Sequence, residues 1–315
     1  MLGRTASALF WMSRYVERAE NMARLLEVGY RISLMPGAGQ GHRDEWRSTL
    51  TSAACAQSYA EKYSDIDGAR VIDFLLFDQD NPSSVRSCLK AARNNGRAVR
   101  TALTRDVWES LNSTWNELAQ IDPKTITADR LPSFLEWVKQ KAMGFRGALL
   151  GTMLRTDPYY FSQLGNFIER ADNTARILDV KYFILLPRPS DVGSELDAQQ
   201  WAQVLRSVSA HRAYRWFYKD SRYKPWLVSE FLILQEEMPR SLLFTYNWIN
   251  LALDGLGDLY GQRYACHDLA FETKSTLKKG RMEQIFQSGL HEFLQNFMDA
   301  NNQLSQSIAK TYNFP

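Results

Sequence analysis

A segment of 14 residues occurs twice in this chain of 315 residues, and this repeat limits the possible folds more than any other feature. Residues 15–28 read YVERAENMARLLEV, and residues 167–180 read FIERADNTARILDV. Eight of the 14 positions are identical and five are conservative, which indicates an internal duplication. A chain built in this way is expected to contain two halves of similar structure.

Further matches extend the repeat beyond this motif. Residues 71–85 (VIDFLLFDQDNPSSV) resemble residues 228–242 (VSEFLILQEEMPRSL). Matched single positions are Trp46 with Trp201, Leu50 with Leu205, Phe74 with Phe231, Pro82 with Pro239 and Ser84 with Ser241. All matched segments keep the same order along the chain. We therefore predict a first repeat at 1–152 and a second at 153–315, packed as one unit over 1–315.

Apolar side chains recur at helical spacing along most of the chain, and the alternation typical of strands is not sustained anywhere. In the first motif copy, for example, apolar or small residues recur at Val16, Ala19, Ala23 and Leu26. The pattern predicts an all-α fold of about 10–12 helices in two pseudo-symmetric repeats. We expect long helices near 6–34, 44–63, 82–104, 131–153, 157–186, 195–218, 239–260 and 280–312, and shorter ones near 67–78, 106–119, 224–234 and 263–276.

Composition excludes several classes of protein. The 38 basic and 35 acidic side chains nearly balance, whereas a dedicated nucleic-acid binder usually has a strong basic excess. Cys55, Cys88 and Cys266 lie far apart and form no CxxC motif, so neither a disulfide framework nor a zinc site is indicated. No apolar run is long enough to span a membrane. We expect a cytoplasmic protein.

No catalytic motif is evident. The four histidines share no spacing, and neither HExxH nor the paired ExxH of di-iron bundles occurs. There is also no P-loop and no GxSxG. Because no nucleophile and base can be paired from the sequence, we do not expect the chain to be an enzyme by itself.

The repeated motif carries a polar face. At about 100° per residue, Glu17, Asn21 and Arg24 lie roughly opposite the apolar face of the predicted helix. Surface positions usually drift between copies, because substitutions there change stability by within ~0.5 kcal/mol. This face has not drifted, so we expect it to be buried. Its candidate site residues are Glu17, Arg18, Glu20, Asn21, Arg24, Glu169, Arg170, Asp172, Asn173 and Arg176.

Three interpretations of this polar face remain open. In the first, the two helices meet near the pseudo-twofold axis, and Glu17, Arg24, Glu169 and Arg176 form a crossed set of charge-assisted hydrogen bonds. In the second, the face lines a pocket whose carboxylates and amides could hold Mg²⁺ and whose arginines suit carboxylate or phosphate. In the third, the face binds a partner protein.

Two basic stretches are candidate anion sites. Arg93, Asn94, Arg97 and Arg100 lie at spacings that keep them on one side of a helix, and the second half has no equivalent. Arg212 and Arg215 alternate with aromatic residues, as in sites that stack nucleobases. Such helices are also common as solvated or core-packed faces. An RNA-binding adaptor is therefore kept as an alternative, although nucleic acid is not the expected partner.

The segments LFWMSRYVERAENMARLLEV and YFSQLGNFIERADNTARILDV resemble the bacterial alpha-E family. Residues 92–112 (ARNNGRAVRTALTRDVWESLN) and 81–85 (NPSSV) share the resemblance, so it spans most of the chain. It implies an all-helical protein with the Glu-Arg motif at both positions. The resemblance implies an arginine at position 166 in the second copy, but this chain has Asn166, which argues against a fully symmetric site.

The resemblance also implies partners. Proteins similar to this family accompany, or are fused to, circularly permuted ATP-grasp ligases and transglutaminase-like peptidases. We accordingly expect an accessory, scaffold or substrate-carrier protein that works with an ATP-grasp-type amide ligase. The alternative is a catalytic or ligand-binding protein whose site is the repeated polar face, with Mg²⁺ as a possible cofactor. A homo-oligomer is compatible with either function.

Overall fold

The computed structural model describes residues 1–34, 42–183, 194–219 and 222–315. These residues form fifteen α-helices and two short 3₁₀ helices, and no strand, so the predicted all-α fold is confirmed. The first half contains α1 (Gly3–Ser33), α2 (His42–Ser52), α3 (Ala56–Lys62), α4 (Gly68–Leu76), α5 (Val85–Ala98), α6 (Arg105–Ala119) and α7 (Leu131–Thr152). The second contains α8 (Asp157–Phe183), α9 (Glu195–Ser207), α10 (His211–Tyr218), α11 (Pro225–Ile233), α12 (Leu242–Tyr260), α13 (Ala265–Lys279), α14 (Met282–Ser288) and α15 (Leu290–Thr311).

The expected number of about 10–12 helices was too low, because each of three segments predicted as one helix forms two helices in the structure. The breaks in 44–63, 195–218 and 280–312 fall at Ala54, Ser209 and Gly289. These residues have φ angles of 54°, 57° and 94°, which end an α-helix and turn the chain. Left-handed alanine and serine are uncommon, so nothing in the local sequence signals the first two breaks. Residues 184–186 of the predicted helix 157–186 lie outside the described residues.

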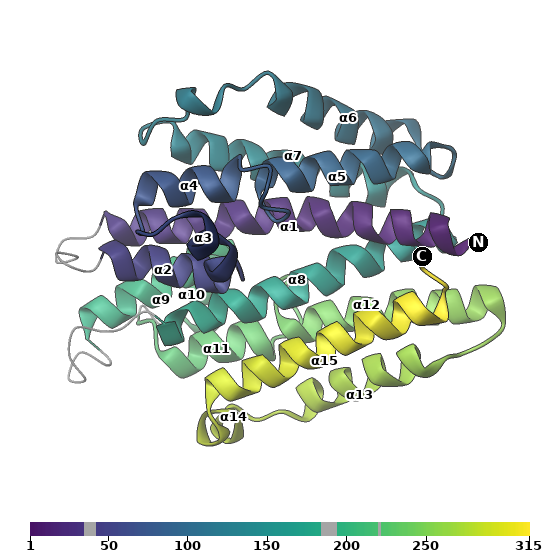
Figure 1. Cartoon of the computed structure of the whole chain (residues 1–315). Helices are drawn as coiled ribbons and strands as arrows, with labels where there is room; N and C mark the ends of the chain where they lie inside the picture. The colour runs from purple at the N-terminus through teal and green to yellow at the C-terminus, as the bar shows by residue number, and fades with distance from the viewer. Residues whose placement is uncertain (35–41, 184–193, 220–221) are drawn as a thin grey trace.

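Two long helices, α1 and α8, run side by side through the middle of the molecule (Figure 1). Helices α5 and α7 pack on α1, and α12 and α15 pack on α8. The buried apolar side chains of both halves join in one continuous core. The motif copies lie on α1 and α8, so this arrangement brings the two copies together at the centre. The equivalence of the two halves as wholes stays a prediction.

A glycine permits the close approach of these two helices. A Cβ atom added to Gly165 of α8 would lie 2.0 Å from the carbonyl oxygen of Phe10 in α1. Any side chain at this position would therefore push the backbones apart. The absence of a Cβ lets the polar faces of the two motif copies meet directly.

The loops before α5 and α12 have the same local hydrogen bonds. Ser84 caps α5 by accepting from the backbone N–H of Ser87 at 3.1 Å, and its hydroxyl donates to the carbonyl of Asp78. Ser241 caps α12 by accepting from Phe244 at 3.0 Å and donates to the carbonyl of Gln235. The matched segments of the sequence thus adopt the same cap. No helix in the described part of the chain is long and apolar enough to cross a membrane.

Candidate functional site

Two reciprocal ion pairs join the motif copies. Arg18 of α1 donates from Nε to Glu169 Oε1 at 2.6 Å and from Nη2 to Oε2 at 3.0 Å. Arg170 of α8 donates from Nε to Glu17 Oε1 at 2.9 Å and from Nη2 to Oε2 at 3.1 Å. A crossed network therefore exists, but its arginines are Arg18 and Arg170. In each motif copy, the arginine that directly follows the glutamate faces the opposite helix. The predicted crossing had not included these two arginines.

The arginines assigned to the crossing by sequence, Arg24 and Arg176, pair within their own helices instead. Arg24 bonds Glu20 at 2.5 Å, and Arg176 bonds Asp172 at 2.6 Å, because residues four apart are neighbours on a helix. Glu17, Arg24 and Glu169 are buried, as expected. Arg176 is also mostly buried, as expected, although 27% of its side chain is exposed.

Arg24 is held at a second point, and Arg176 is not. Arg24 Nη1 donates to the carbonyl of Ser207 at 2.5 Å and to Ser209 Oγ at 3.0 Å, at the joint between α9 and α10. Arg176 bonds only Asp172 within the described residues. Part of its guanidinium is thus available to another group.

Three arginines outside the shared motif complete the network. Arg14 Nε donates to Glu169 Oε2 at 2.8 Å. Arg146 Nη1 bonds Glu20 and, at 2.8 Å, Glu17. Arg240 bonds Glu17 at 3.1 Å and Glu20 at 2.7 Å. None of these three arginines was predicted from the sequence. Only Arg14 could have been, because it lies one helical turn before Arg18 and therefore on the same face of the helix.

Positive charge exceeds negative charge at the crossing. Among the described residues, seven arginines bond four carboxylates. Burial alone would raise the pKa of Glu17, but the guanidiniums of Arg170, Arg146 and Arg240 outweigh it and lower that pKa to about 2. Burial likewise opposes ionisation of Glu169, and Arg18 and Arg14 lower its pKa to about 2. Glu17 and Glu169 are therefore ionised at neutral pH.

This arrangement does not suit Mg²⁺. Glu17 accepts hydrogen bonds from three arginines and Glu169 from two, so neither carboxylate is free to bind a metal ion directly. Mg²⁺ also requires nearly octahedral coordination by oxygens, whereas the guanidiniums around these carboxylates supply only N–H donors. In the described parts of the chain, no group of three or more His, Cys, Asp or Glu side chains is placed to hold a metal.

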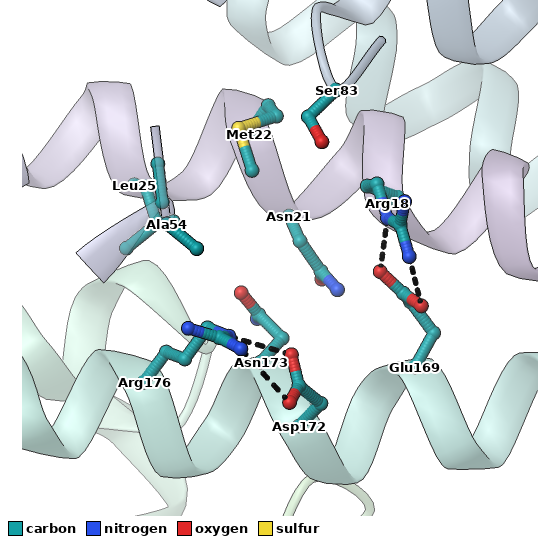
Figure 2. A pocket seen from close by; sticks show the side chains of 11 residues that line it. Arg18, Asn21, Met22, Leu25, Ala54, Ser83, Glu169, Asp172, Asn173 and Arg176 are labelled. Carbon is teal, nitrogen blue, oxygen red and sulfur yellow. Dashed lines mark hydrogen bonds and ion pairs between the residues drawn. The ribbon is translucent and has the colours of Figure 1, made fainter. Parts of the chain in front are cut away.

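A cavity of about 170 Å³ opens between α1 and α8 beside these pairs (Figure 2). Its size is comparable with the ~150 Å³ engineered cavity that admits benzene. Its walls combine both motif copies with the α2–α3 joint and the loop before α5. The lining residues are Arg18, Asn21, Met22, Leu25, Ala53, Ala54, Ser83, Glu169, Asp172, Asn173 and Arg176.

Two asparagines of the motif point into this cavity, Asn21 from α1 and Asn173 from α8 (Figure 2). They are 2% and 3% exposed. Neither the oxygen nor the nitrogen of the Asn21 amide, nor the Asn173 nitrogen, has a hydrogen-bond partner among the described residues. An unpaired buried polar group costs roughly 1–3 kcal/mol, so such groups call for an explanation. A bound polar ligand would supply the missing partners.

The basic stretches do not line this cavity. Arg93 is partly buried and bonds Asn112 at 2.8 Å, while Asn94 and Arg97 are exposed on α5. Arg100 lies beyond the end of α5, in the 3₁₀ helix Arg100–Ala102. Arg212 and Arg215 are exposed on α10, which also presents Trp216, 80% exposed. The proposed anion and RNA roles of these residues stay predictions.

The sequence matches, over residues 1–313, the family Alpha-E, described as "a predicted alpha-helical domain with a conserved ER motif". The chain belongs to the Alpha-E family. Two curated relatives, an uncharacterized protein of Mycobacterium bovis and one of Mycobacterium tuberculosis, are each 34% identical to it over 118 residues. Each match covers 33% of this Alpha-E chain but only 13% of the relative. No solved structure matches the chain.

Proposed function

We propose that this Alpha-E protein binds a small polar ligand between its two motif copies and presents it to an amide-forming enzyme of the ATP-grasp type. The observation that carries the binding role is the pair of buried, unpaired amides of Asn21 and Asn173. The surrounding ion pairs satisfy one another without these amides. The network thus holds the helices in place, and the asparagines are left for a ligand.

The chemistry of the lining restricts the ligand. Asn21 offers both a donor and an acceptor, and Asn173 offers a donor. The unpaired part of the Arg176 guanidinium suits a carboxylate or carbonyl oxygen. A cavity of about 170 Å³ has room for one small molecule. These features fit a compound of amino-acid size that carries an amide or carboxylate, which is also the kind of substrate an amide ligase joins.

A role as accessory protein or substrate carrier, not as catalyst, agrees with the side chains present. All three cysteines are buried and free of disulfides. Burial raises the pKa of Cys55 to about 11 and that of Cys88 to about 12, so neither supplies a thiolate at neutral pH. The partners are proposed from the family resemblance, and they include the transglutaminase-like peptidase. An ATP-dependent partner would place the protein in the cytoplasm.

The relatives favour a role beside other domains. The chain spans about an eighth of their length, since each match covers 13% of the relative. The matching segment in those proteins is thus accompanied by much additional sequence. We propose that this chain meets comparable domains as separate proteins or as fused parts.

Isothermal titration of the purified protein with amino acids and dipeptides tests the binding role. At least one compound should bind, and Asn21→Leu or Asn173→Leu should abolish its binding. Asn116→Leu, at an exposed position on α6, is the matched control and should bind normally. Binding that survives both cavity variants would overturn the proposed site. Purified ATP-grasp ligase should then use the same compound at a lower KM when this protein is added.

A further inference from the structure

The loops before α5 and α12, which match in sequence, carry different residues at one position that faces the arginines and carboxylates of the two motif copies. Pro82, Ser83 and Ser84 match Pro239, Arg240 and Ser241 in the aligned sequence. Both serines that follow cap their helices with the same hydrogen bonds, so positions 83 and 240 occupy equivalent places before α5 and α12. Ser83 and Arg240 therefore hold the same place in the two loops, and their side chains can be compared directly.

On the second-half side, the arginine fills its site. The Arg240 side chain is 7% exposed, and its guanidinium bridges two carboxylates of α1. Nη1 bonds Glu17 Oε1 at 3.1 Å, and Nη2 bonds Glu20 Oε1 at 2.7 Å. The fork of the guanidinium thus spans the two acidic positions of the first motif copy.

On the first-half side, the corresponding acids are Glu169 and Asp172 of α8, which occupy the same motif positions. Ser83 lines the cavity together with both acids. Figure 2 shows the Ser83 side chain on the α1 side of the space and the two carboxylates on the α8 side. Because serine lacks the long arm of arginine, the cavity lies where an arginine at position 83 would extend.

We propose that this cavity receives a guanidinium group of the ligand, between Glu169 and Asp172, in the place that Arg240 fills on the other side. The inference rests on the proposed ligand-binding function and names the chemical class of the ligand. A guanidino compound of amino-acid size meets the other features of the site as well. The unpaired Asn21 oxygen accepts from a guanidinium N–H, and Asn173 and Arg176 donate to a carboxylate.

The acids of the second motif copy bind one guanidinium fewer than those of the first copy. Glu17 and Glu20 together bond four arginines, namely Arg24, Arg146, Arg170 and Arg240. Glu169 and Asp172 bond three, namely Arg14, Arg18 and Arg176. The first pair of acids shows that this geometry holds a fourth guanidinium. The pKa of Glu169, lowered to about 2, keeps that acceptor ionised at neutral pH.

Arginine and citrulline provide the decisive comparison, because citrulline replaces the guanidinium with a neutral urea group of nearly the same shape. The full chain should bind arginine at least about tenfold more tightly than citrulline by isothermal titration, since charge-assisted hydrogen bonds are the stronger ones. Methylguanidinium should bind weakly and compete with arginine. Equal affinities for arginine and citrulline would overturn the guanidinium assignment.

The substitution Ser83→Arg tests whether the cavity receives a guanidinium group by supplying that group from the protein itself. The new side chain should occupy the cavity as Arg240 does on the other side, and arginine affinity should fall by about tenfold or more without a lower melting temperature. Ser83→Ala is the control that keeps the cavity, and it should bind arginine like the wild type. Arginine binding that persists in a folded Ser83→Arg protein would contradict the proposal.

The failure of this inference can be told apart from failure of the proposed function. If neither arginine nor methylguanidinium binds the wild type, the guanidinium assignment is wrong whatever the variants do. If another compound then binds and depends on Asn21, the ligand-binding function still holds. If no compound depends on Asn21 or Asn173, the proposed function itself is wrong.

Discussion

Arg18 and Glu169 meet through two parallel hydrogen bonds, although 151 positions separate them in the chain. The same two-bond geometry recurs in reverse between Arg170 and Glu17. Sliding one helix along the other would break both pairs and leave buried charges unpaired. These contacts therefore fix the register of α1 against α8, and with it the position of the cavity that lies between the motif copies.

Removing one charge from this network should destabilise the protein strongly. In Glu17→Gln, the buried guanidiniums of Arg170 and Arg240 lose their shared carboxylate, and breaking a buried pair typically costs about 3–5 kcal/mol. Urea denaturation measures the change. Glu272→Gln, at an exposed position on α13, should stay within about 0.5 kcal/mol of the wild type. Similar stabilities for the two variants would refute the network's structural role.

Stability should fall in acid because of Glu17 and Glu169. Their pKa values are lowered to about 2 in the folded protein, against about 4.3 in an unfolded chain. Groups with a lowered folded pKa stabilise the fold above the unfolded pKa, and this contribution is lost as the pH falls towards 2. The free energy of unfolding should thus decrease steadily below about pH 4.3. A folded Glu17→Gln/Glu169→Gln variant should show a shallower decrease over this range.

The sequence predicts the parts of this architecture that depend on local pattern. Helical period is a local property, and it identified an all-α fold without any tertiary information. Burial of Glu17 and Glu169 followed from the unchanged motif in both copies. The breaks at Ala54 and Ser209 were missed because a left-handed backbone at alanine or serine is imposed by surrounding packing.

The partners of the motif could not be read from the sequence. Arg146 lies 129 positions from Glu17, and Arg240 lies 223 positions from it. Only the packing of α7 and of the loop before α12 brings them to the same carboxylate. The cavity itself depends on what is missing from its walls, such as a long side chain at Ser83. The period and the motif describe which residues face inward but not how much space remains between them.

Gly165→Ala should separate the two motif helices. The new Cβ would lie 2.0 Å from the Phe10 carbonyl oxygen, so the backbones must move, at a cost of roughly 1–3 kcal/mol. Gly147→Ala, on an exposed face of α7 with nothing within 4 Å of its Cβ, should instead stabilise the protein by about 0.5–1 kcal/mol. Chemical denaturation of both variants tests the expected opposite signs. A neutral Gly165→Ala would mean that the helices do not need this close approach.

Replacing Asn21 by leucine should make the protein more stable while it abolishes ligand binding. The Asn21 amide has no partner among the described residues, so its removal relieves a penalty of about 1–3 kcal/mol, and the leucine adds apolar contact with Met22 and Leu25. Asn301→Leu is the matched control, because its equally buried amide donates to the Ile168 carbonyl at 3.0 Å and accepts from the Tyr246 hydroxyl at 3.1 Å. That substitution removes both of these buried hydrogen bonds and should destabilise the fold. A higher melting temperature for Asn21→Leu and a lower one for Asn301→Leu would identify Asn21 as a residue kept at a cost to stability, as expected for a binding residue. A lower melting temperature for both would mean that Asn21 supports the fold, and the argument for a ligand at this cavity would then lose its main observation.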